Sequence, residues 1–150
     1  MPTALPRLIA GCLPLLLAAC TAASGPAPPL PIEPPLQGDW RVIGLSGIDL
    51  PADYPEVAGT VRLQFSRESS RIQGFNGCNR FFGRFDDQQG LQISELGASK
   101  RYCPATAALE SALMTALGQV GAHRQVDGEL QLLGADQRPL LRLLPSAGND

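Results

Sequence analysis

The residues with the widest chemical repertoire in this sequence are four cysteines and one histidine: Cys12, Cys20, Cys78, Cys103 and His123. A dithiol redox centre usually has the spacing Cys-x-x-Cys, which the sequence lacks. A zinc site needs several Cys, His or carboxylate ligands close together, and His123 is the only histidine. The sequence therefore disfavours redox and metal chemistry, and we expect the protein to use no cofactor.

Hydrolytic chemistry also lacks its usual residues. His123 is the sole candidate for the base of a catalytic triad, and no Gly-x-Ser-x-Gly elbow presents a serine nucleophile. Paired carboxylates for glycosidase chemistry would have to come from a small set of acids, two of which fall in a predicted turn where solvation is the default: Glu95, Glu110, Asp86 and Asp87. We therefore expect that the protein is not an enzyme.

The charge pattern also bears on the choice of partner. The formal net charge is −2, and the basic segment from Arg67 to Arg71 is mixed with Glu68 and serines. A nucleic-acid-binding face normally shows a basic patch interleaved with aromatic residues, and no such patch is visible along the sequence. We therefore expect no nucleic-acid partner.

The N-terminus indicates export. Residues 1–19 carry Arg7 followed by an apolar run, which is shorter than the 20 or so residues that a bilayer needs and is typical of a signal peptide. The run ends in Leu17-Ala18-Ala19-Cys20, which resembles the lipobox of bacterial lipoproteins, in which the cysteine becomes the lipidated first residue. An ordinary secretory signal with an incidental Cys20 is the alternative. By resemblance to enterobacterial sorting, Thr21 after the cysteine favours an outer-membrane location facing the periplasm.

Residues 20–36 form the second predicted segment, the lipidated Cys20 and a proline-rich tether. Proline fixes φ and removes a backbone donor, so the tether is expected to form neither a helix nor a central strand. Such segments tend towards polyproline II and extend by about 3.1 Å per residue.

The expected export leaves one pair of cysteines in the folded part. Cys12 lies in the segment that is removed and Cys20 carries lipid, so Cys78 and Cys103 remain in an oxidising compartment. We expect them to form a structural disulfide, which for a 25-residue separation would contribute roughly 3–4 kcal/mol. Two reduced buried thiols, or a redox or metal pair, are the alternatives.

The pattern after residue 36 predicts mostly strands. Apolar and polar residues alternate from Val61 to Phe65, and Phe81, Gly83 and Phe85 share one face of a later strand. Asn76-Gly77 and Asp127-Gly128 are typical of tight turns. Phe81, Phe82 and Phe85 could line a groove for lipid or peptide, but packing in the core is the favoured interpretation.

One helix is predicted between the strands. Pro104 suits a first helical turn, and a stripe at spacings of four, four and three runs through Leu109, Leu113, Leu117 and Val120. Gly121 would then cap the C-terminal end. Strands before and after one helix predict an α+β fold, in which a curved antiparallel sheet or small open β-barrel has one main helix packed on it.

The segment Gln73-Gly-Phe-Asn-Gly-Cys-Asn-Arg-Phe-Phe-Gly-Arg-Phe85 resembles the signature of the META domain, the family of HslJ-like envelope lipoproteins. The turn residues Gly77, Cys78 and Asn79 carry most of this resemblance. The order of segments from Gly38-Asp39-Trp40 to the closing strands agrees with it, so residues 37–145 are predicted to form a META-like domain. Asn79 could contact a ligand, but a bond from its side chain to local backbone is the favoured interpretation.

The resemblance implies a fold and a compartment but no reaction. We expect a lipid-anchored periplasmic protein with a non-enzymatic binding or envelope-stress role, whose partner is an envelope protein or a small apolar ligand. The alternative is a lysozyme- or protease-inhibitor-like lipoprotein, which would expose a loop with a charged key residue.

Overall fold

The computed structural model describes residues 36–57 and 60–146. The predicted signal peptide, Cys20 and all of the predicted tether except Leu36 lie outside the described residues. No helix in the described part of the chain is both long enough and apolar enough to cross a bilayer.

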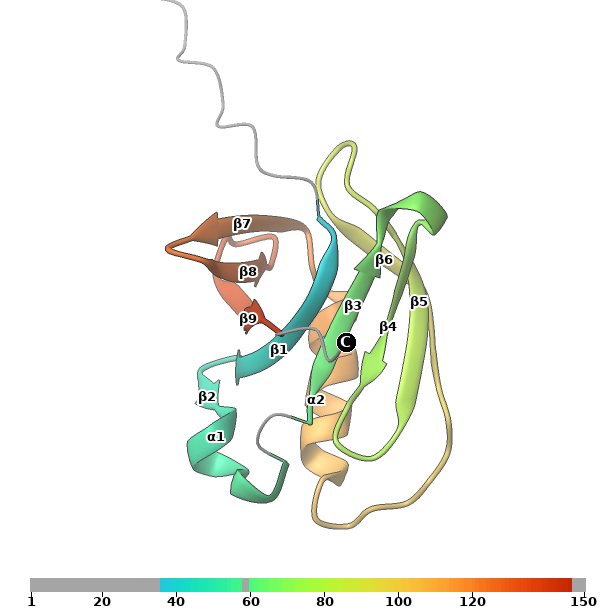
Figure 1. The fold of residues 1–150 in the computed structure, drawn as a ribbon, viewed down its shortest axis with the longest axis vertical. Coiled ribbons are helices and arrows are strands. Elements are labelled where there is room, and N and C mark those ends of the chain that lie inside the picture. Colours follow the sequence, from blue (N-terminus) through green and yellow to red (C-terminus); the bar gives the residue numbers. More distant parts are fainter. Residues whose placement is uncertain (1–35, 58–59, 147–150) are drawn as a thin grey trace, which may run out of the picture. The chain divides into compact units, whose positions relative to one another are not determined.

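The described residues form a curled antiparallel sheet with one main helix against it, which confirms the predicted α+β class (Figure 1). Eight strands follow one another in the order β6-β5-β4-β3-β1-β9-β8-β7, and the short β2 (Ile48–Asp49) pairs with β1. The eight are β1 (Gly38–Leu45), β3 (Arg62–Ser66), β4 (Arg71–Phe75), β5 (Arg80–Asp86), β6 (Gln92–Ala98), β7 (Ala122–Val126), β8 (Glu129–Leu133) and β9 (Pro139–Pro145).

The turns between neighbouring strands follow from their residues. Asp127 and Gly128 both have positive φ, 52° and 81°, as a two-residue type I′ hairpin between β7 and β8 requires, so this predicted turn is confirmed. A short 3-10 helix, η2 (Arg67–Ser69), connects β3 to β4.

Three irregularities accompany the curl of the sheet. The register shifts between Val42 and Gly44 where β1 meets β9, and similar shifts occur between β5 and β6 and between β8 and β9. Bulges of this kind bend a strand and increase its twist.

The amide of Leu91, just before β6, donates to the carbonyl oxygen of Gly121, just before β7, across 3.0 Å. The two edges of the curled sheet are therefore joined at one end.

The helix α2 (Ala107–Gly118) packs against β1, β6 and β9. The predicted apolar stripe is buried, but both predicted ends of the helix are wrong. Pro104 lies in a turn before the helix, because Thr106 occupies the N-cap position. Gly121 is not the C-terminal cap, because the helix ends at Gly118 and the amide of Gly121 instead donates to Leu133 on β8.

A small insertion between β1 and β3 has no counterpart in the sequence-based prediction. It consists of β2, the helical turn α1 (Leu50–Asp53) and the 3-10 turn η1 (Pro55–Val57). Each element is four residues or shorter, too short to produce a periodic pattern, but Leu50 and Val57 are buried and attach the insertion to the core.

One hydrophobic core fills the space between the sheet and α2. Its members come from six strands (β1, β3, β4, β5, β8 and β9), from α2 and from the segments that flank these elements: Leu36, Trp40, Val42, Leu45, Leu50, Val57, Val61, Leu63, Phe65, Ile72, Phe81, Phe85, Leu91, Leu109, Leu113, Ala116, Leu117, Val120, Leu130, Leu132, Leu141 and Leu143. Leu36 is only 1% exposed, and the indole Nε1 of Trp40 donates to the carbonyl oxygen of Gln37 at 3.1 Å. The core therefore includes a residue that the sequence analysis placed in the tether.

Candidate functional site

The motif turn between β4 and β5 is organised by Asn76. Its buried Oδ1 accepts hydrogen bonds from the amides of Cys78 at 3.2 Å and Asn79 at 2.7 Å. Its own amide donates to the carbonyl oxygen of Asn79 at 3.0 Å. Gly77 has φ +102°, a conformation that favours glycine. The local bond predicted for Asn79 is therefore made by Asn76 instead.

Asn79 connects the turn to distant parts of the chain. Its Nδ2 donates to the carbonyl oxygen of Arg101 at 2.9 Å and to Oε2 of Glu110 at 2.7 Å. Its Oδ1 accepts from the hydroxyl of Ser99 at 2.8 Å and from the amide of Arg101 at 2.7 Å. A side-chain amide has two N–H donors and two acceptor lone pairs, so this buried group is saturated. Asn79 is thus a structural junction, with no bonding capacity left for a ligand.

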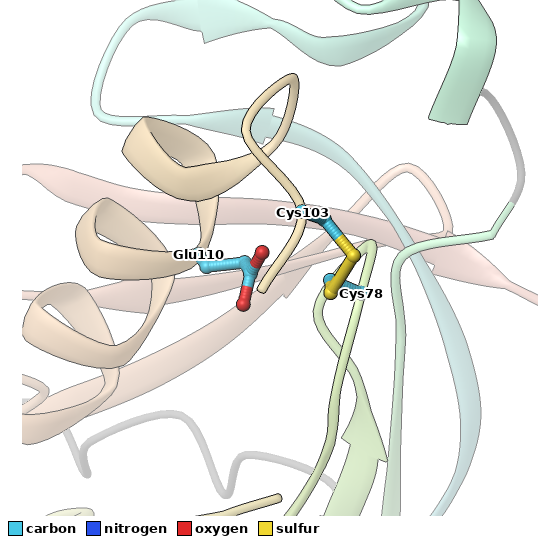
Figure 2. Close-up of side chains that lie close together, drawn as sticks. All are labelled: Cys78, Cys103 and Glu110. Atoms are coloured by element: carbon cyan, nitrogen blue, oxygen red, sulfur yellow. A yellow bond between two sulfur atoms is a disulfide. The ribbon is translucent and has the colours of Figure 1, made fainter. Parts of the chain in front are cut away.

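A disulfide joins Cys78 to Cys103 beside this junction, with a Cα–Cα distance of 6.0 Å. Figure 2 shows the carboxylate of Glu110, on the first turn of α2, directed towards it. The ligand atoms of these three residues lie within 4.8 Å of one another, and no other group of His, Cys, Asp and Glu ligand atoms is this compact in the described chain. A cysteine binds a metal ion as its thiolate, and a disulfide provides no thiolate. Both oxygens of Glu110 are also hydrogen-bonded, Oε1 accepting from the hydroxyl of Thr106 at 2.9 Å.

The other residues singled out for catalysis do not join this cluster. His123 lies half-buried on β7 and has a partner, whereas Glu95 is exposed on β6. Asp86 ends β5 and accepts a bond from the amide of Gln88, and Asp87 forms an ion pair with Arg67. Within the described residues, every buried side-chain nitrogen or oxygen has a hydrogen-bond partner. The polar interior is therefore satisfied by the protein itself.

Of the three phenylalanines that the sequence analysis assigned to the core, two lie there and one does not. Phe81 and Phe85 are buried, whereas Phe82 is 61% exposed. Phe82 pairs with Gly97 on β6, and a Cβ on Gly97 would lie only 2.7 Å from the Phe82 ring. The aromatic ring thus covers a glycine on the outside of the sheet.

Phe82 belongs to a polar and cationic surface that the sequence analysis missed. The faces of β1, β3, β4 and β5 that point away from α2 carry nine residues that we call the arginine face: Arg41, Arg62, Gln64, Arg71, Gln73, Phe75, Arg80, Phe82 and Arg84. The expectation that no basic patch is interleaved with aromatic residues is therefore wrong. The arginines are spread over four strands, so only the register of the sheet shows that they lie together.

Two shallow hollows mark this face. One of about 270 Å³ lies between Arg62, Phe75 and Arg80, and the other, of about 250 Å³, lies between Arg71, Phe82 and Arg84. Gln73 borders both hollows. Two carboxylates also reach the hollows, Asp39 and Glu95, and Asp39 accepts a bond from Nε2 of Gln64 at 3.2 Å.

A rigid loop lies at the edge of the arginine face. Residues 99–103 begin the connection from β6 to α2, and the amide of Ser99 donates to the carbonyl oxygen of Arg80 at 3.0 Å. Asn79 holds both backbone polar groups of Arg101, and Cys103 is in the disulfide. The side chain of Tyr102 is nevertheless 82% exposed.

Comparisons with known proteins agree with this architecture. The chain is similar to a DUF4847 family protein from Bacteroides vulgatus ATCC 8482, with a TM-score of 0.52 and 12% identity over 75% of this chain and 95% of that one. At this identity the likeness concerns the fold alone. No curated protein matches the chain significantly. The META domain profile matches residues 34–147, which include the whole sheet, the motif turn and α2. The chain therefore belongs to the META domain family.

Proposed function

We propose that this protein is a non-enzymatic binding protein of the cell envelope, anchored through lipid on Cys20 at the periplasmic side of the outer membrane. It would serve envelope assembly or stress tolerance by binding a partner through the arginine face. The observation that carries this proposal is the contrast between two surfaces. The polar groups of the motif turn are satisfied by other groups of the domain, whereas the five arginines of the arginine face have no carboxylate partner among the described residues.

The anchoring part of the proposal rests on the sequence, in which an apolar run ends in Leu-Ala-Ala-Cys. Mass spectrometry of the membrane-extracted protein should find Cys20 as an acylated N-terminus. Cys20→Ala should leave the leader uncut or release the protein from the membrane fraction. Cys12→Ala is the matched control, because Cys12 lies within the leader and should not affect acylation. A soluble mature chain that begins elsewhere would contradict the anchor.

The binding part can be tested in a strain that lacks this chain and is sensitive to envelope stress. The wild-type chain should restore tolerance, and Arg62→Glu with Arg80→Glu should not, because the charge of the face is reversed. Arg138→Glu changes an exposed arginine in the turn between β8 and β9 and should restore tolerance fully. Full rescue by the double variant at equal abundance would show that the face is not the functional surface.

The loop at residues 99–103 favours a second candidate, an inhibitor of a hydrolase. Inhibitory loops must hold one backbone shape while exposing a key side chain, and here a disulfide and Asn79 fix the backbone beneath Arg101 and Tyr102. Titration against lysozymes and serine proteases would reveal inhibition in the nanomolar range that Arg101→Ala or Tyr102→Ala abolishes. If none of these enzymes is inhibited, the inhibitor candidate is rejected and the binding proposal is the remaining one.

A further inference from the structure

The arginine face places like charges directly opposite one another. Arg41 pairs with Arg62 across β1 and β3, and Arg71 pairs with Arg84 across β4 and β5. Directly opposed like charges destabilise a sheet. None of the five arginines of the face forms a salt bridge with an acid in the described part of the chain, where the ion pairs involve Arg67, Arg138 and Arg142 instead. The stability of the domain does not account for this arrangement, but an anionic partner would.

The cationic groups form two rows with a different chemistry between them. Arg41, Arg62, Phe75 and Arg80 follow one another across four strands, and Arg71 and Arg84 form the second row. Phe75 and Arg71 are four residues apart on β4, so the rows are separated by about 13 Å at the usual rise of a strand. Asp39, Gln64, Gln73 and Phe82 form the row between them, with the carboxylate of Asp39 at its β1 end bonded to Gln64. Its two amides are joined by a hydrogen bond from Gln73 to Gln64, which orients them on the surface.

This composition matches an acidic polysaccharide. A guanidinium group binds a carboxylate through two parallel hydrogen bonds, and a side-chain amide can both donate to and accept from a hydroxyl. The exposed ring of Phe82 offers an apolar surface on which the C–H face of a sugar can pack. Two cationic rows separated by amides and an aromatic ring therefore fit a chain of hydroxylated sugar rings that carry carboxylates.

The shape of the face favours a polymer over a lipid surface. The sheet curls around α2, so the arginine face is on the outside of the curve (Figure 1). A flat bilayer can touch only a strip of a convex surface, whereas a flexible chain can follow both rows. We propose that the arginine face binds a carboxylated polysaccharide of the polyuronate type. This inference rests on the proposed envelope location, where such polymers are accessible.

The test is a binding titration of the full chain in a neutral detergent, with polygalacturonate as the probe and uncharged dextran as the control. Polygalacturonate should bind, with an affinity that falls as salt is raised, and dextran should not. Arg62→Gln with Arg80→Gln, and Arg71→Gln with Arg84→Gln, should each weaken binding by about tenfold or more, because each removes two charge-assisted contacts. Arg138→Gln is the matched control and should bind as the wild type does. Thermal unfolding of each variant would confirm that the fold is kept.

A second comparison separates sugar recognition from charge alone. Phe82→Ala should weaken the binding of polygalacturonate but leave the binding of inorganic polyphosphate, which has no sugar ring, unchanged. Equal loss with both polymers would overturn the assignment to a polysaccharide. Tighter binding of single-stranded DNA, of polyphosphate or of phosphatidylglycerol vesicles than of polygalacturonate would also overturn it. A chain that binds polygalacturonate but carries no lipid on Cys20 would instead contradict only the proposed anchor.

Discussion

The amide nitrogen Nδ2 of Asn79 lies 2.7 Å from the carboxylate oxygen Oε2 of Glu110, and this bond ties the turn between β4 and β5 to the first turn of α2. The two residues are 31 positions apart in the sequence. The same two segments are joined covalently by the disulfide between Cys78 and the loop that precedes α2. The turn between β4 and β5 thus attaches α2 to the sheet.

The bond between Asn79 and Glu110 can be tested by reversing its polarity. Asn79→Asp removes both donors and places a carboxylate against the Glu110 carboxylate, so we expect it to lower the free energy of unfolding by about 3–5 kcal/mol. Adding Glu110→Gln supplies a donor again and should recover part of that loss. Chemical denaturation of both variants measures the effect. Equal stability of the single and double variants would show that the two side chains are not coupled.

The disulfide is predicted to stabilise the domain without taking part in its binding. Replacing Cys78 and Cys103 together by Ser should lower the free energy of unfolding by roughly 2–5 kcal/mol, the usual loss for a small secreted domain. Polymer binding should persist below the new melting temperature. Thiol titration of the denatured, unreduced protein gives the direct check, and two reactive thiols from this pair would mean that the bond is absent in solution.

The burial of Leu36 predicts where the folded domain begins. Leu36→Ala should cost about 2–5 kcal/mol, because a buried leucine leaves a cavity when it is truncated. Gln37→Ala changes an exposed neighbour and should stay within about 0.5 kcal/mol of the wild type. Denaturant unfolding of the two variants decides between this boundary and one at residue 37. Equal stability of the two variants would show that the folded domain begins at residue 37 and that Leu36 belongs to the tether.

Gly74 is predicted to be irreplaceable on steric grounds. A Cβ at this position would lie 2.1 Å from the carbonyl oxygen of Arg62 and 2.6 Å from the Phe81 ring. Gly74→Ala should therefore prevent folding or cost at least about 3 kcal/mol, the upper range for overpacking. Gly118→Ala, at the end of α2 and with open space around it, should be neutral or stabilise by up to about 1 kcal/mol. Expression level and thermal melting would show the difference.

The sequence predicts local structure well where a strand has one buried face. Alternation along β5 placed Phe81 and Phe85 on the buried face and Arg80, Phe82 and Arg84 on the other, as the structure has them. The assignment of Phe82 to the core failed because it followed the residue type and not that alternation. The predicted ends of α2 were also wrong. Thr106 and the hydrogen bond from Gly121 to Leu133 determine where the helix begins and ends, and neither produces a periodic pattern in the sequence.

The site was harder to predict because it depends on register. Arg41 and Arg80 are 39 positions apart along the chain, and each alone is an ordinary exposed residue of a strand. Only the pairings through Arg62 and Phe75 bring them into one row. The bonds of Asn79 to Arg101 and Glu110 depend on tertiary structure in the same way, so the sequence could indicate that Asn79 matters but not what it holds.

The pairing of β1 with β9 has a consequence for how the protein is made. Trp40 lies opposite Pro145, so the middle of the sheet joins segments from the two extremes of the domain. Contacts between residues this distant in sequence close slowly, because the loop entropy is lost before the contact forms. During synthesis β1 has no β9 to pair with until almost the entire domain has emerged. The domain is thereby kept from completing its fold early, which is the condition under which a polypeptide can still be threaded through a narrow translocation channel.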